Sequence, residues 1–432
     1  MAGEHKILSR EKILTILTKI YPESKIDIQT LTAKDGVGEG QNFSGQVQAC
    51  DVRALVDGQV KEHHWMVKFP PNDPNRMPVT RASHMEQKEI QFFSTLLPAF
   101  EDFIKERKAN IRFTFKKSPY SEYHEEVNTE DCQKSSMLVM EHMGQYGFRD
   151  CSTRHFGLDM DHVKLVLEEV AKFHAVSYVY FKTKMAGDLN DMIKKEELYC
   201  RDFFSTNPGE VMQSAAVMIR DYMYKSWSTA LENAQKPGQD LPGSLKRSIA
   251  EDGDIFARRA ALLTPDNSEF NVLNHGDVWF NNFLFKYDNG QPVEMCLVDV
   301  AVLRWASPCT DLAYFLFSST TPQFREVHLD AMLSFYQSKL AQFLAQLGDD
   351  PNVYPLSQLK VDFNKYALVG FVMSLWTLPT ALMDKSRPQN EGDPQTGLTD
   401  VRHGQSGDLQ LQLNSMVYGN FMDMVKRGVF TL

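Results

Sequence analysis

The stretch Asn274-His275-Gly276-Asp277-Val278-Trp279-Phe280-Asn281-Asn282 is the most informative part of this 432-residue chain. Asn282 is the fifth residue after Asp277, and a second acid, Asp299, closes an apolar run seventeen residues after Asn282. This spacing is typical of kinase-type phosphoryl transfer, in which one carboxylate orients a hydroxyl and two oxygen ligands hold magnesium. An ordinary His-Gly-Asp turn is the competing interpretation. The asparagine and the second aspartate favour the phosphotransferase.

Each polar residue of this stretch has a predicted role. We expect Asp277 to be the catalytic residue that accepts or orients the proton of the attacking hydroxyl. Asn282 and Asp299 are the predicted Mg²⁺ ligands, because magnesium favours oxygen ligands and bridges the phosphates of ATP. His275 is expected to brace the loop and not to touch substrate.

A glycine-rich segment, residues 37–45, predicts the phosphate-binding half of a nucleotide site. Glycine allows backbone amides to approach phosphates closely, although a plain hairpin turn fits the same residues. An alternating, strand-like run follows at residues 47–55. The candidate nucleotide-binding residues of this segment are Gly38, Gly40, Asn42, Phe43 and Ser44.

A lysine on the next predicted strand adds to this half. Asp57-Gly58 signals a hairpin, and the returning strand at residues 63–69 places Lys68 among apolar neighbours, where its charge requires an anionic partner. The predicted partner is Glu89, in a helix-like stretch at residues 83–97, with Glu86 one turn earlier as a competitor. Such a strand–helix Lys–Glu pair positions nucleotide phosphates in kinases.

Two segments lie between these halves. Residues 136–144 form a buried-looking strand that ends in glycine, and we expect the backbone around Glu141 and Met143 to meet the adenine. An ordinary core strand is the alternative. Residues 161–181 carry apolar side chains at helical spacing, so a helix should underlie the catalytic loop, with Asp159 or Asp161 as its N-cap.

Taken together, the motifs resemble the ecdysteroid kinase-like family, which belongs to the choline and aminoglycoside kinase-like group of small-molecule kinases. The resemblance runs from about residue 36 to about residue 320. Protein kinases are expected to carry arginine where Gly276 stands. The segments that carry the resemblance are 38–44, 89–93 before Leu97-Pro98, 138–141 with Gly147-Phe148, 171–175 and 274–282.

The resemblance implies an α+β, two-lobed, protein-kinase-like fold. A small β-rich N-terminal lobe, residues 1–143, would bind nucleotide phosphates, and a larger helical lobe, residues 144–432, would carry the catalytic loop and the acceptor site. The activity implied is ATP-dependent phosphorylation of a hydroxyl on a small molecule. Asp311 resembles the buried acid that braces the catalytic loop. Val300-Ala301 departs from the family pattern, which has an aromatic residue and then Gln or Glu.

Composition limits the partners and the compartment. A net charge of −10 argues against non-specific nucleic-acid binding, which relies on Lys and Arg. Six cysteines without Cys-x-x-Cys spacing indicate buried thiols in a reducing compartment, and the N-terminus lacks an apolar signal, so a cytoplasmic location is expected. Residues 366–383 are uncharged, but a buried helix is favoured there over a membrane span.

The acceptor is the least determined part of the prediction. Methionine and aromatic residues are abundant at 185–260 and after 325, where they suit an apolar, ecdysteroid-like hydroxylated acceptor or plain helical core. A pseudokinase-like protein that binds nucleotide or a lipophilic ligand without transfer is the alternative, and Val300-Ala301 is its only residue-level support. A protein kinase fits less well, because no Ala-Pro-Glu segment follows Asp299.

Overall fold

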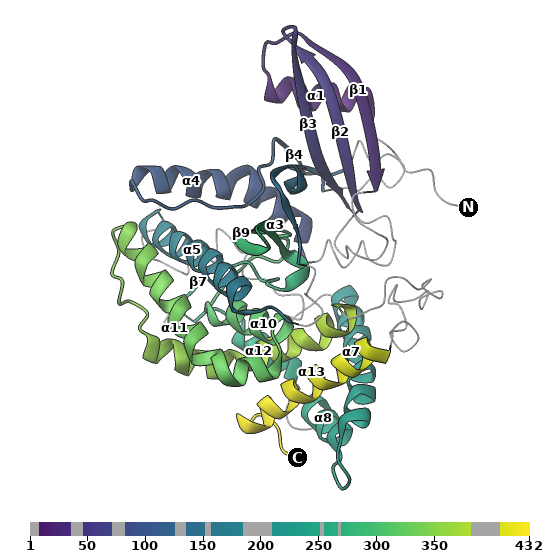
Figure 1. The fold of residues 1–432 in the computed structure, drawn as a ribbon, viewed down its shortest axis with the longest axis vertical. Helices are drawn as coiled ribbons and strands as arrows, with labels where there is room; N and C mark the ends of the chain where they lie inside the picture. Colours follow the sequence, from purple (N-terminus) through teal and green to yellow (C-terminus); the bar gives the residue numbers. More distant parts are fainter. Residues whose placement is uncertain are drawn as a thin grey trace, which may run out of the picture. The chain divides into compact units, whose positions relative to one another are not determined.

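The chain forms two compact units in the computed structural model: residues 1–99 with 115–149, and residues 100–114 with 150–432 (Figure 1). The structure describes residues 8–35, 46–70, 83–125, 135–151, 157–184, 210–250, 255–266, 269–381 and 407–432. The first unit is built on a β-sheet and the second is mainly helical, so the predicted α+β, two-lobed architecture is confirmed.

The first unit contains a five-stranded antiparallel sheet in the order β1-β2-β3-β5-β4. Asp57 and Gly58 both have positive φ, 50° and 82°, which confirms the predicted tight hairpin between β2 and β3. The strands are β1 (Ile26–Asp35), β2 (Gln46–Val56), β3 (Gln59–Phe69), β4 (Tyr120–Glu122) and β5 (Met137–Glu141).

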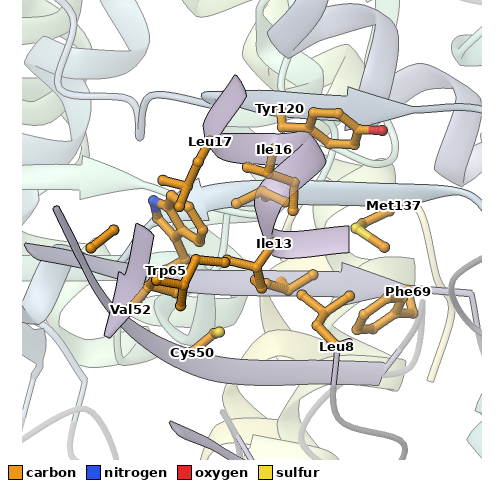
Figure 2. Close-up of a cluster of buried hydrophobic side chains, with 14 residues drawn as sticks. Leu8, Ile13, Ile16, Leu17, Cys50, Val52, Trp65, Phe69, Tyr120 and Met137 are labelled. Carbon is orange, nitrogen blue, oxygen red and sulfur yellow. The ribbon is translucent and has the colours of Figure 1, made fainter. Parts of the chain in front are cut away.

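Helix α1 (Arg10–Ile20) packs its apolar side against this sheet (Figure 2). Ser9 caps it by accepting a hydrogen bond from Lys12 N. The shared core also contains Cys50 of β2 and Trp65 of β3, both buried. The helix begins at Arg10. Its buried side chains are Ile13, Ile16 and Leu17.

The helix predicted at residues 83–97 is longer than expected. Helix α3 (Met85–Gln91) continues through a π-helical turn, η1 (Phe92–Leu96), into α4 (Leu97–Glu106). Pro98, which has no backbone N–H to donate, is the second residue of α4 and directly follows the π-helical turn and Leu97. The strand ending at Glu141 is followed by the 3₁₀ helix η3 (Met143–Tyr146) and the short strand β6 (Phe148–Asp150).

The second unit places long helices around a short hairpin. Within it, α5 packs against α11, and α10 packs against α12 (Figure 1). Asp159 is the N-cap of α5, since its Oδ1 accepts hydrogen bonds from Asp161 N and His162 N. The helices are α5 (Met160–Lys184), α7 (Glu210–Ala234), α8 (Leu241–Ala250), α9 (Ile255–Leu262), α10 (Cys309–Ser319), α11 (Pro322–Gln346), α12 (Leu356–Ala381) and α13 (Gly407–Lys426).

The remaining strands of this unit frame the Asp–Asn–Asp stretch. β7 (Val272–Asn274) pairs with β10 (Arg304–Ala306), and β8 (Phe283–Asp288) pairs with β9 (Gln291–Leu297). The uncharged segment predicted as a buried helix lies largely within α12, whose residues 366–372 are all buried. In the described part of the chain, no helix combines the length and apolarity needed to cross a membrane.

Candidate active site

The catalytic loop begins where β7 ends, and its backbone requires glycine at one position. Gly276 has φ 82°, a conformation that side chains rarely adopt. A Cβ atom there would lie 2.1 Å from the carbonyl oxygen of Val302. The residue between His275 and Asp277 must therefore be small, which gives a physical reason for the His-Gly-Asp sequence in this chain.

Asp277 is held at both ends of its carboxylate. Asn282 Nδ2 donates to Asp277 Oδ2 at 2.6 Å and to the Asp277 carbonyl at 3.0 Å. The hydroxyl of Tyr314 donates to Asp277 Oδ1 at 2.6 Å. The five-residue spacing noted in the sequence is thus a direct contact, closed by the 3₁₀ turn η6 (Phe280–Asn282).

The β8–β9 hairpin brings Asn282 and Asp299 to the same end of the sheet. Phe283 pairs with Leu297, and Val298 N donates to the Asn282 carbonyl at 3.0 Å. Asp299 follows directly with φ 64°, a left-handed conformation that is uncommon for a residue other than glycine. Residues in this conformation cluster at active sites, although Asp57 and Asn289 adopt it in the hairpin turns of this chain.

The carboxylates of Asp277 and Asp299 lie in the same site, and the charge of Asp299 affects the ionisation of Asp277. Burial, and next the negative charge of Asp299, raise the pKa of Asp277 to about 7, although the hydrogen bonds from Tyr314 and Asn282 act in the opposite direction. Asp299 therefore lies close enough to Asp277 for their charges to repel. A divalent cation bound here would relieve that repulsion.

The side chains present fit a magnesium ion. Asp299 supplies a carboxylate, and Asn282 gives its amide N–H group to Asp277, so its carbonyl oxygen Oδ1 is the atom left to bind a cation. Both are hard oxygen donors of the kind Mg²⁺ prefers. Neither Asn282 nor Asp299 supplies the nitrogen or sulfur ligand that a softer metal prefers.

Asp311 braces the loop from α10. Its Oδ2 accepts a hydrogen bond from His275 N at 2.7 Å, and its Oδ1 accepts one from Gly276 N at 2.9 Å. His174 of α5 contacts the same carboxylate through Nε2 at 3.2 Å. His174, His275 and Asp311 are buried and Gly276 is half-buried, so the position of the loop depends on this carboxylate.

Other residues of α10 hold successive positions of the loop. Thr310 Oγ1 donates to Asn274 Oδ1 at 2.8 Å, and Ser319 Oγ accepts from Phe280 N at 3.1 Å. Tyr314 contacts Asp277, which lies between Asn274 and Phe280 in the loop. Helix α10 therefore fixes the loop along its length.

His275 supports the loop from inside. Its ring is fully buried, and Nδ1 accepts a hydrogen bond from Asp277 N at 3.3 Å. Burial lowers the pKa of His275, which keeps the ring neutral. This is the bracing role expected for it.

In the first unit, Lys68 and Glu89 form the ion pair that the sequence predicts. Lys68 Nζ lies 2.7 Å from Glu89 Oε2, and the two side chains are only 9% and 4% exposed. Glu86, the predicted competitor, is half-buried one turn earlier on α3. The buried position of Glu89 explains why this glutamate is the partner.

The other predicted nucleotide-binding residues have mixed outcomes. Gly38, Gly40, Asn42, Phe43 and Ser44 lie outside the described residues. Glu141 N donates to the carbonyl of Lys117 at 3.0 Å, and Met143 is buried at the start of η3. Their contact with adenine stays a prediction, as do the functional assignments of residues 1–143 and 144–432.

Sequence reasoning missed Tyr314, Thr310 and Ser319. Each is a polar residue on a helix whose side chains are otherwise mostly apolar and wholly buried. A buried polar side chain needs a hydrogen-bond partner, and that was the available signal. The sequence does not reveal which partner, because Tyr314 and Asp277 are 37 residues apart.

A sheet-based unit and a helical unit with a braced Asp–Asn–Asp site define a protein-kinase-like phosphotransferase fold. The chain belongs to the ecdysteroid kinase-like family, whose sequence model matches residues 39–349. It is therefore a small-molecule kinase. No curated protein matches the sequence.

Several solved structures are similar to the chain at low identity. A candidate aminoglycoside phosphotransferase from Ralstonia eutropha is 9% identical with a TM-score of 0.42, over 96% of this chain and 98% of that one. A microcompartment-associated aminopropanol kinase is 10% identical with a TM-score of 0.36, over 96% and 98%. An ethanolamine kinase from Plasmodium vivax is 12% identical with a TM-score of 0.37, over 94% and 83%.

Proposed function

We propose that this protein transfers the γ-phosphate of ATP to a hydroxyl of a small, neutral, lipophilic molecule of the ecdysteroid type. The observation that carries the proposal is the Asp277 carboxylate, hydrogen-bonded to Asn282 and close to the charge of Asp299. A carboxylate that can receive a proton, beside two oxygen ligands for magnesium, is the arrangement phosphoryl transfer to an alcohol requires.

The proposed roles follow the geometry of each group. Asp277 receives or orients the proton of the acceptor hydroxyl, and Asn282 and Asp299 would hold Mg²⁺. When bound, magnesium neutralises charge on the nucleotide phosphates. Lys68, fixed by Glu89, would orient those phosphates. The amides of residues 38–44 and the backbone at 141–143 would contact the rest of the nucleotide.

The acceptor is proposed to be neutral and apolar for two reasons. A chain with net charge −10 does not favour an anionic acceptor, and the family name points to ecdysteroid-like alcohols. Choline-like or aminoglycoside-like cations are the competing acceptors. Several of the residues first considered for an apolar pocket form helical core instead, since Met223, Trp227 and Phe371 are fully buried. These buried residues therefore do not help to decide between a neutral and a cationic acceptor.

Incubation of the purified protein with labelled ATP, magnesium and a panel of sterols, glycosides, choline and aminoglycosides tests the proposal. We expect transfer to a neutral hydroxylated compound, abolished in Asp277→Asn. Preferential turnover of a cation contradicts the acceptor class. A metabolite extract in place of the panel identifies an acceptor that the panel lacks.

Nucleotide binding is tested separately from transfer. A ligand that binds only the folded state raises its stability, so MgATP should raise the melting temperature of the wild type. Asp299→Asn should weaken that rise, because it removes a proposed magnesium ligand. If neither MgATP nor MgADP shifts the melting temperature or gives a calorimetric signal, the kinase proposal is wrong.

The alternative is a protein that binds nucleotide or a lipophilic ligand without transfer. It is favoured by one observation: Val300 and Ala301 are buried apolar residues that directly follow Asp299. A polar side chain at this place is expected in the family, so its absence from the sequence could reduce activity. Binding of MgATP with no transfer to any acceptor would establish this alternative.

A further inference from the structure

Tyr314 is the least expected member of the site. It lies on α10 three residues after Asp311, and residues at that spacing share one face of a helix. Asp311 holds the backbone of the catalytic loop, whereas the Tyr314 hydroxyl reaches the side chain of Asp277 at 2.6 Å. The tyrosine is 2% exposed, so its hydroxyl is shielded from water, whereas the Asp277 carboxylate is half-buried.

The two hydrogen bonds to Asp277 restrict different motions. Asn282 holds Oδ2 and Tyr314 holds Oδ1, so together they prevent rotation of the carboxylate about its terminal bond. Asn282 is also a proposed magnesium ligand, and its position therefore depends on the metal. Tyr314 comes from a separate, buried helix and holds its oxygen independently of that ligand.

We propose that Tyr314 is a positioning residue for phosphoryl transfer, whose hydroxyl holds the Asp277 carboxylate in the orientation that meets the acceptor alcohol. The inference rests on the proposed function. A misoriented catalytic group lowers the rate of the chemical step without changing the binding of a substrate it does not touch. Tyr314 should therefore affect turnover and not the affinity for MgATP.

The chain contains a matched control. Tyr354 is also 2% exposed, and its hydroxyl also donates to an aspartate oxygen at 2.6 Å, in this case Asp362 Oδ2. Asp362 lies on α12 and has no proposed part in catalysis. Tyr354→Phe thus removes the same hydrogen bond to an aspartate from a buried tyrosine, together with a 3.5 Å contact to Cys309 Sγ. A loss of stability that follows from losing the aspartate bond is common to both variants.

The experiment compares Tyr314→Phe and Tyr354→Phe with the wild type. Melting temperatures are measured first, and kinetics are then run below the lowest of them. We expect kcat to fall about 10- to 100-fold in Tyr314→Phe, the loss typical of one hydrogen bond to a charged group. The KM for ATP and the calorimetric Kd for MgATP should stay within about twofold. Tyr354→Phe should keep the wild-type kcat.

Three results overturn the inference, and they are distinguishable. If the wild type transfers phosphate and the two variants have equal kcat, Tyr314 has no positioning role although the proposed function stands. The same holds if Tyr314→Phe loses MgATP affinity in proportion to its rate. If the wild type binds MgATP and transfers phosphate to no acceptor, the proposed function fails and the role of Tyr314 fails with it.

Discussion

Replacement of Asp311 by asparagine should loosen the catalytic loop while leaving the shape of the side chain almost unchanged. Aspartate uses one oxygen for His275 N and the other for Gly276 N, at 2.7 and 2.9 Å. Asparagine has a single acceptor oxygen. One of the two N–H groups, of which that of His275 is buried and that of Gly276 is part-buried, must then face an amide NH₂ group, which cannot accept a hydrogen bond.

The size of the effect follows from these contacts. A buried donor left unsatisfied costs about 1–3 kcal/mol, and loss of the negative charge weakens the remaining bond by about 1 kcal/mol. The loop should therefore open more easily by about 2–4 kcal/mol, which corresponds to roughly a 30- to 1,000-fold increase in its opening equilibrium.

Hydrogen exchange measured by mass spectrometry gives this quantity for the peptide that covers residues 272–283. Exchange of a protected amide is proportional to the population of the open state. Asp362→Asn is the control, because Asp362 accepts hydrogen bonds from Tyr354 and Gln358 and none from the loop. If the loop exchanges at the wild-type rate in Asp311→Asn, or equally fast in both variants, the bracing role is refuted.

Three further changes test other parts of the structure. Asp277→Asn should abolish transfer while MgATP still binds calorimetrically, so loss of binding in a folded variant contradicts its assignment. Lys68→Met should lower turnover. It should also destabilise the first unit by about 3–5 kcal/mol, because it leaves Glu89 buried without this cation. An unchanged denaturant-unfolding curve would show that the ion pair does not stabilise the unit. Burial acts to lower the pKa of His162, but its hydrogen bonds to Cys151 and Asp159 raise the pKa above 6.5 overall. The charged form of His162 therefore stabilises the fold below pH 6.5. This contribution disappears as the pH rises through the folded-state pKa. The melting temperature of His162→Gln should accordingly fall furthest below that of the wild type near pH 6 and approach the wild-type value at high pH. If the difference in melting temperature grows with pH, the predicted pH dependence is wrong.

Much of the site is local in sequence, and for that reason it was predictable. Asp277 and Asn282 belong to one turn, and a hairpin of fixed register carries the chain from Asn282 to Asp299. Short connections leave few arrangements open, so residue spacing alone indicates proximity. The Lys68–Glu89 pair was predictable for a related reason, since a lysine in an apolar strand must find an anion.

The sequence by itself determined the two-lobed class of fold, the Asp–Asn–Asp chemistry and the need for a buried partner of Lys68. Only the tertiary structure decided which groups hold Asp277 in place. Tyr314 and Asp311 reach the loop from a helix 35 to 37 residues away in sequence, and His174 reaches Asp311 across 137. A periodic apolar pattern shows that a helix is buried. It does not specify which element the helix packs against, and that packing decides the partner of every polar side chain on it.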